Sequence, residues 1–169
     1  KAIELARTGG WSGVKLRDLA RECDIALGTL YNYYPTKDSL VLDVVQQFWQ
    51  NCFHQKTFPE GNVLVKLDWL YAMMKQSIDE FSAEFLHAAS GLSPAALEEA
   101  KTRELRAQTH LTRQLALALQ TSFPDETEEQ LNERAAFLFT SLLGCLENRG
   151  YQYSSLRRWL EASLSHPSK

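Results

Sequence analysis

The sequence predicts an all-α protein, with a small N-terminal domain of three helices that contains a helix-turn-helix and a larger C-terminal helical domain. Apolar residues recur at steps of three and four along most of the chain, which is the spacing of amphipathic helices. Glycine and proline gather between these segments, where helices are expected to end. The 169 residues suit one or two small domains, which we expect at residues 1–50 and 51–169.

The first helix is predicted from Ala2, Ile3, Leu5 and Ala6, and the Gly9-Gly10 pair is expected to end it. Lys1 has no N-cap residue before it. We therefore expect this helix to begin upstream of Lys1, in a segment that carries further basic residues.

Residues 14–40 encode two short helices joined by a tight turn, a break at Pro35, and the start of another helix. Asp24 falls at the turn, because aspartate tolerates left-handed backbone better than most residues. Ile25 is expected to fill the angle between the two helices. The first of them has an apolar face made by Leu16, Leu19, Ala20 and Cys23. Two short helices at a steep angle commonly present one helix end to the DNA major groove.

The second short helix is expected to bury Leu30 and Tyr34 and to point its other side chains outward. Gly28 would let the backbone approach a phosphate closely. Hydroxyls and the amide of Asn32 suit phosphate and base contacts. The residues predicted to contact DNA are Lys15, Arg17, Leu27, Gly28, Thr29, Tyr31, Asn32, Tyr33 and Lys37. In the alternative interpretation these are ordinary core helices of a bundle, and the tyrosines are half-buried aromatics.

Beyond this segment, Thr36 is expected to cap a helix that runs to about Cys52. A loop over residues 58–62 precedes a long amphipathic helix over residues 63–85, with apolar residues at steps of three and four. Ser93-Pro94 begins another helix, since proline is favoured at the first helical position. That helix is expected to reach about Thr121.

The segment from Glu126 to Arg149 is apolar on two sides, and Gly150 is expected to end it before a short last helix. A helix that is apolar on two sides must be covered on both. We therefore expect a homodimer in which each copy supplies two helices. The predicted interface residues are Leu131, Ala135, Leu138, Leu142, Leu146, Leu156, Trp159 and Leu160. The alternative is one self-contained core.

A family resemblance rests on residues 16–20 (Leu-Arg-Asp-Leu-Ala), residues 28–31 (Gly-Thr-Leu-Tyr) and residues 34–40 (Tyr-Pro-Thr-Lys-Asp-Ser-Leu), in that order. Together with Gly10-Trp11 they resemble the DNA-binding domain of TetR-type (tetracycline-repressor-like) transcriptional regulators, over roughly residues 1–50. The resemblance implies a bacterial, cytoplasmic homodimer that binds a palindromic double-stranded DNA operator and is released by a small-molecule effector. The chain departs from the family pattern at Val14, Asp24, Ala26 and Leu27, which replace common polar or glycine positions.

The resemblance also implies an effector pocket in the larger domain. Aromatic and methionine side chains make adaptable cavities. The candidates for the lining are Trp49, Phe53, Trp69, Met73, Met74, Phe81 and Phe137. For each of them the alternative is a place in the core.

Charge favours DNA binding only weakly. The formal net charge is −3, and residues 1–50 hold six basic and six acidic side chains, which sum to zero. DNA-binding domains usually have a clearer basic surface. The alternative function is therefore a helical, dimeric ligand-binding or interaction protein that has lost specific DNA binding.

Residues that carry enzymatic or metal chemistry are sparse. His54, His87, His110 and His166 are scattered without metal-ligand spacing, and no HExxH or GxSxG sequence occurs. The three cysteines form no CxxC pair and are expected to be reduced thiols; a redox switch at Cys145 is the alternative. We therefore predict no catalytic site, metal or cofactor. No apolar run reaches the length of a membrane span, so no membrane partner is expected.

Overall fold

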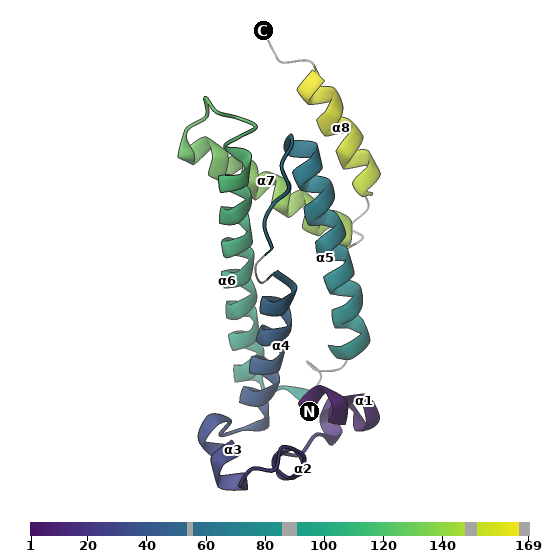
Figure 1. Cartoon of the computed structure of the whole chain (residues 1–169), viewed down its shortest axis with the longest axis vertical. Coiled ribbons are helices and arrows are strands. Elements are labelled where there is room, and N and C mark those ends of the chain that lie inside the picture. The colour runs from purple at the N-terminus through teal and green to yellow at the C-terminus, as the bar shows by residue number, and fades with distance from the viewer. Residues whose placement is uncertain (54–55, 86–90, 148–151, 166–169) are drawn as a thin grey trace. The chain divides into compact units, whose positions relative to one another are not determined.

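A computed structural model describes the backbone of residues 1–53, 56–85, 91–147 and 152–165, and the side chains of these residues except 82–85 and 165 (Figure 1). Every regular element within these ranges is a helix, which confirms the predicted all-α fold. The helices are α1 (Ala2–Gly13), α2 (Leu16–Glu22), α3 (Leu27–Tyr33), α4 (Lys37–Phe53), α5 (Val63–Phe85), α6 (Pro94–Leu119), α7 (Glu128–Leu146) and α8 (Tyr153–Ser165). The predicted helix end at Gly150 and three of the histidines (His54, His87, His166) lie outside the described residues.

The chain divides into two compact units. The first consists of Lys1–Gln55 and Gln76–Leu105, and the second of Lys56–Lys75 and Arg106–Lys169. Helices α5 and α6 therefore contribute residues to both units. A domain boundary at residue 50 stays a prediction.

The first unit is built on a core that joins α1, α2, α3 and α4. Its buried members are Ala2, Ala6, Trp11, Val14, Leu16, Leu19, Ala20, Leu30, Leu40 and Val41. These are the apolar positions of short helices that are too short to be stable alone, so their mutual burial supplies the stability. Both helices of the helix-turn-helix, α2 and α3, contribute buried residues to this core.

Gly10 interrupts the helical geometry of α1, at the Gly9-Gly10 pair where the first helix is predicted to end. Its backbone lies in the left-handed region, with φ 67° and ψ 165°, and helical geometry resumes up to Gly13. A residue with a Cβ would be strained there, whereas glycine is not. The bend brings Trp11 into the core, where it is buried.

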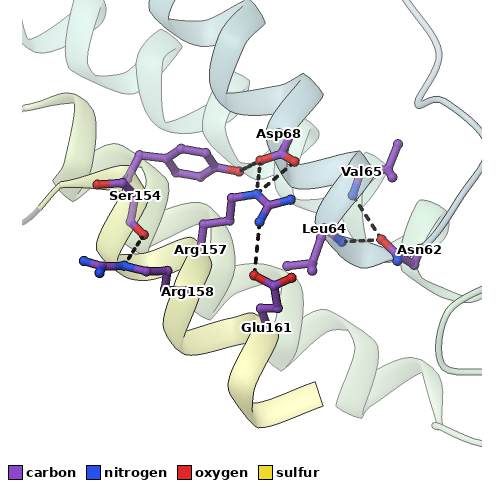
Figure 2. Close-up of polar contacts among 9 residues, drawn as sticks. Asn62, Leu64, Val65, Asp68, Ser154, Arg157, Arg158 and Glu161 are labelled. Atoms are coloured by element: carbon purple, nitrogen blue, oxygen red, sulfur yellow. Dashed lines mark hydrogen bonds and ion pairs between the residues drawn. The ribbon is translucent and has the colours of Figure 1, made fainter. Parts of the chain in front are cut away.

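Polar caps fix where the longer helices begin. Thr36 Oγ1 accepts from the Ser39 backbone N–H at the start of α4, as predicted. Asn62 Oδ1 accepts from the N–H groups of Leu64 and Val65 at the start of α5 (Figure 2). Ser93 Oγ accepts from the Ala96 N–H at the start of α6. Helix α7 begins in a capping box, in which Thr127 and Gln130 satisfy each other's backbone N–H groups.

The core of the second unit takes residues from α5, α6 and α7. Its most deeply buried side chains are Leu67, Leu70, Leu115, Leu119 and Leu142. Four residues of the predicted dimer interface belong to this same core, because the chain itself buries Leu131, Ala135, Leu138 and Leu142. They cannot at the same time form a surface for a second copy. Of the other four, Leu146, Leu156 and Leu160 are half-buried, and Trp159 is exposed.

Lys66 is a buried lysine in the second unit. Its ammonium group donates to the Gly61 carbonyl and, at 3.2 Å, to Thr121 Oγ1 just beyond the end of α6. A cation at the carboxyl end of a helix interacts favourably with the helix dipole. Lys66 therefore connects the start of α5 to the end of α6.

Among the described helices, none combines the length and the apolar character needed to span a bilayer.

Candidate nucleic-acid interface

The turn between α2 and α3 has the left-handed residue that the sequence predicts. Asp24 has φ 53°, and the N–H of Ile25 donates to the Ala20 carbonyl at 3.0 Å. Two side chains near the turn differ from expectation, since Cys23 and Ile25 are exposed. The turn lies at the surface, and Leu27 packs against the core in their place. Leu27, predicted to point toward DNA, is thus half-buried.

Helix α3 exposes a polar strip. Gly28, Thr29, Asn32 and Tyr33 are exposed and follow one another around adjacent helix turns, and Tyr31 is exposed beside them. Tyr33 is 75% exposed, although large aromatic side chains usually bury most of their surface. Leu30, on the opposite side of the helix, is buried in the core. The core therefore holds α3 in a position that leaves its hydrogen-bonding groups accessible.

Basic side chains flank this strip. Lys15 and Arg17 at the start of α2 are exposed, while Arg21 contacts Asp18 at 3.2 Å. The Lys37 ammonium donates to the Ser12 carbonyl at 2.8 Å and so ties the start of α4 to the end of α1. Val14, which resemblance to the family placed at a common phosphate-contacting position, is buried in the core.

Tyr34 joins the end of α3 to α4. Its hydroxyl donates to Asp43 Oδ2 at 2.7 Å, and the side chain is half-buried. The hydrogen bond to Asp43, together with burial, raises the pKa of Tyr34 to about 12 from its ordinary value of 10. This bond fixes the carboxyl end of α3 relative to α4.

We expect the stability of the chain to depend on pH through Tyr34. A phenol with a raised pKa in the folded state contributes its stability fully below pH 10 and loses it as pH rises through 12. Tyr34→Phe should cost about 1 kcal/mol at pH 8, because it removes one hydrogen bond to a carboxylate. Urea unfolding of both proteins at pH 8 and pH 11 measures the difference, which should shrink at the higher pH. An equal difference at both pH values would contradict the assignment.

Comparison with known proteins identifies this helix-turn-helix. A family model described as bacterial regulatory proteins of the tetR family matches residues 1–44, which span α1, α2, α3 and the first part of α4. The similarity to this family lies in the helix-turn-helix segment of the chain. The matched residues include the whole exposed strip of α3.

Curated relatives match the same end of the chain. It is similar to the HTH-type transcriptional repressor KstR of Rhodococcus jostii (strain RHA1), at 27% identity over 45% of this chain and 36% of that protein. It is 37% identical to the KstR repressor of Mycolicibacterium smegmatis (strain ATCC 700084 / mc(2)155) over 25% of this chain and 21% of that protein. The HTH-type regulator YuxN of Bacillus subtilis (strain 168) is 32% identical over 34% of this chain and 18% of its own length. The matches thus span about a third or less of these relatives.

The residues predicted to line an effector pocket are divided between the two units. Trp49, Phe53 and Phe81 gather in the first unit, where the Trp49 ring lies 5.1 Å from that of Phe81 and 6.5 Å from that of Phe53. In the second unit Trp69 lies 5.0 Å from Phe58, Met73 is half-buried and Met74 is buried. Phe137 is exposed. A cleft of about 430 Å³ in the first unit is lined by other residues, among them Tyr34, Asp43 and Phe48.

The sequence did not predict two polar contacts near the helix-turn-helix, Lys37 with Ser12 and Tyr34 with Asp43. The bond between Lys37 and the Ser12 carbonyl joins residues 25 positions apart, and a carbonyl leaves no signal in a sequence. Tyr34 and Asp43 are nine positions apart on different helices. For this bond the sequence offers only a tyrosine at the end of one helix and an acidic residue on the next.

Proposed function

We propose that this chain is a DNA-binding transcriptional regulator of the TetR family, acting as a repressor and as a homodimer in the bacterial cytoplasm. The observation that carries the proposal is the exposed polar strip of α3, held over a buried core by Leu30. The family match over residues 1–44 supports it, as do two relatives that are named repressors.

In this proposal α3 enters the major groove. Thr29 and Tyr33 supply hydroxyls and Asn32 an amide that can bond adenine through two atoms, while Gly28 lets the backbone approach a phosphate. Lys15, Arg17 and Lys37 would contact the phosphates beside the groove. The Tyr34–Asp43 bond would hold α3 at a fixed angle to α4 during this contact.

A second copy of the chain is proposed as the partner, on the surface shared by α7 and α8. Phe137 of α7 is 56% exposed and Trp159 of α8 is 57% exposed, and their ring centroids lie 6.4 Å apart. We call this pair the aromatic ridge. Helix α7 has no charged residue from Ala135 through Leu146. An uncharged surface can face its own copy across a two-fold axis without like charges meeting.

We call the helix-turn-helix domain of one copy a head. Dimerisation would also compensate for the small number of basic side chains in one head. The helix-turn-helix and the start of α4 offer four basic side chains, Lys15, Arg17, Arg21 and Lys37. Two heads bound to the two halves of a palindrome double the phosphate contacts.

We also propose a small-molecule effector that releases the DNA by favouring a different separation of the two heads. The cluster of Trp49, Phe53 and Phe81 supports an apolar or aromatic ligand, because partly buried rings offer a large contact area.

The test is selection of operator DNA from a library of random duplexes with the whole chain. We expect an enriched inverted repeat whose half-sites lie about one helical turn apart, or a multiple of it. If Lys15, Arg17 and Lys37 of both heads contact phosphates, log affinity should fall with log salt at a slope of about −5. Failure to enrich any sequence would overturn the proposal.

The rival proposal is a dimeric ligand-binding or interaction protein without specific DNA binding. The burial of Val14 in the core and the absence of a side-chain cap at Ala26 of α3 favour it. It expects binding to DNA that is weak and the same for every sequence, together with an intact dimer.

A further inference from the structure

Helix α8 buries little apolar surface against the rest of the second unit. None of its side chains from Tyr153 to Leu164 is fully buried. The half-buried ones are Tyr153, Leu156, Arg157 and Leu160, which lie on one face at helical spacing. Only two of these four are aliphatic, so the burial of apolar surface can supply only part of the attachment.

Asp68 of α5 accepts hydrogen bonds from the two polar members of that face, Tyr153 and Arg157. Tyr153 Oη donates to Asp68 Oδ1 at 2.6 Å, and Arg157 Nε lies 3.0 Å and 3.1 Å from the two carboxylate oxygens (Figure 2). Tyr71, one turn further along α5, stacks on the Tyr153 ring with a centroid distance of 3.9 Å and an interplanar angle of 8°. Asp68 lies 85 residues before Tyr153 in the chain, so this contact is tertiary.

Both donors keep their protons over the physiological range. The hydrogen bond to Asp68 raises the pKa of Arg157, and burial, followed by the bond to Asp68, raises the pKa of Tyr153. Arg157 also contacts Glu161 on its own helix at 3.3 Å. Hydrogen bonds to a charged partner are about twice as strong as neutral ones. The side chains of Asp68 and Arg157 are each more than a third exposed, so solvent weakens their ion pair.

The face held by Asp68 lies opposite the aromatic ridge. Arg157 and Trp159 are two residues apart, which separates them by about 200° around a helix. A rotation of α8 that released Arg157 would therefore move Trp159 away from Phe137. The rotation of α8 about its own axis therefore determines whether the aromatic ridge is formed.

We infer that Asp68 is a positioning residue, which fixes the rotation of α8 through Arg157 and Tyr153 and thereby presents the aromatic ridge to a second copy of the chain. This inference rests on the proposed dimer. It adds that the strength of the dimer depends on a carboxylate of α5 that lies on the far side of α8 from the ridge.

The experiment compares Asp68→Asn, Arg157→Gln and the charge swap Asp68→Arg/Arg157→Asp in the whole chain. The matched control is Arg158→Gln, because Arg158 is exposed on the same helix and its Nε bonds the Ser154 carbonyl of that helix at 3.4 Å (Figure 2). Sedimentation equilibrium gives the dimer dissociation constant, and hydrogen exchange reports the protection of α8.

Asp68→Asn and Arg157→Gln should each raise the dissociation constant about tenfold and speed exchange in α8, as expected for loss of a partly exposed charged hydrogen bond. The charge swap should restore much of both, and Arg158→Gln should change neither. Rescue by the swap is a result that general damage to the fold would not give.

An unchanged dissociation constant and unchanged α8 exchange in Asp68→Asn would overturn the inference. A wild-type chain that stays monomeric would overturn the dimer itself, and with it the role of the ridge. In that case α8 exchange in Asp68→Asn still decides whether Asp68 holds the helix, so the two failures are distinguishable.

Discussion

Replacing Thr29 and Tyr33 together with alanine should lower affinity for the selected operator about 100-fold or more. Each lost base or phosphate contact costs about 1–3 kcal/mol, and a dimer loses it in both heads. Both side chains are exposed, so the folded domain should keep its stability. Fluorescence anisotropy with the operator and with an unrelated duplex measures specific and nonspecific affinity, and thermal unfolding checks the fold.

The matched control for this pair is Thr102→Ala, since Thr102 is an exposed threonine on α6 whose hydroxyl bonds the Glu98 carbonyl of its own helix. It should leave operator affinity unchanged. If the double variant binds operator as tightly as the wild type does, α3 does not read DNA. That result would favour the rival proposal of a protein without specific DNA binding.

Leu142→Ala should lower the free energy of unfolding by about 2–5 kcal/mol. Leu142 of α7 is 0% exposed in the single chain, and alanine would leave a cavity that the surrounding leucines cannot fill. Leu117→Ala is the control, because Leu117 is a leucine of α6 that is exposed, and its replacement should cost less than about 0.5 kcal/mol. Urea unfolding at one fixed protein concentration compares them.

A third variant separates the core from the surface proposed for a second copy. Phe137→Ala, on the exposed side of the same helix, should weaken the dimer while leaving the core packed. If Leu142→Ala instead weakened only the dimer and did not affect the stability of the monomer, the α7 leucines would belong to an interface after all.

The sequence was a reliable guide to local features, because each depends on residues close together in the chain. Asp24 at the turn, Thr36 and Ser93 as caps, and the 63–85 helix all follow from backbone preferences or from helical spacing. The TetR resemblance rested on three short strings in a fixed order, and the family match over residues 1–44 confirms it.

Apolar spacing did not tell which partner covers a given face. The α7 stripe of Leu131, Ala135, Leu138 and Leu142 was predicted to face a second copy, whereas the single chain already buries all four residues. Ile25 and Cys23 look like core residues by type, yet the surface turn exposes both. A hydrophobic pattern shows that a helix face must be buried, but not which part of the chain or which partner buries it.

The sequence by itself determined that this chain is helical, where most of its helices begin, and that its first 44 residues resemble the helix-turn-helix domain of TetR-type regulators. Only the tertiary structure decided which α7 face is core and which is the aromatic ridge of Phe137 and Trp159. It alone joined Tyr34 to Asp43, and Asp68 to Tyr153 and Arg157. The reason is physical: caps and turns depend on neighbours in the chain, whereas burial and hydrogen bonds between helices depend on how the whole chain packs.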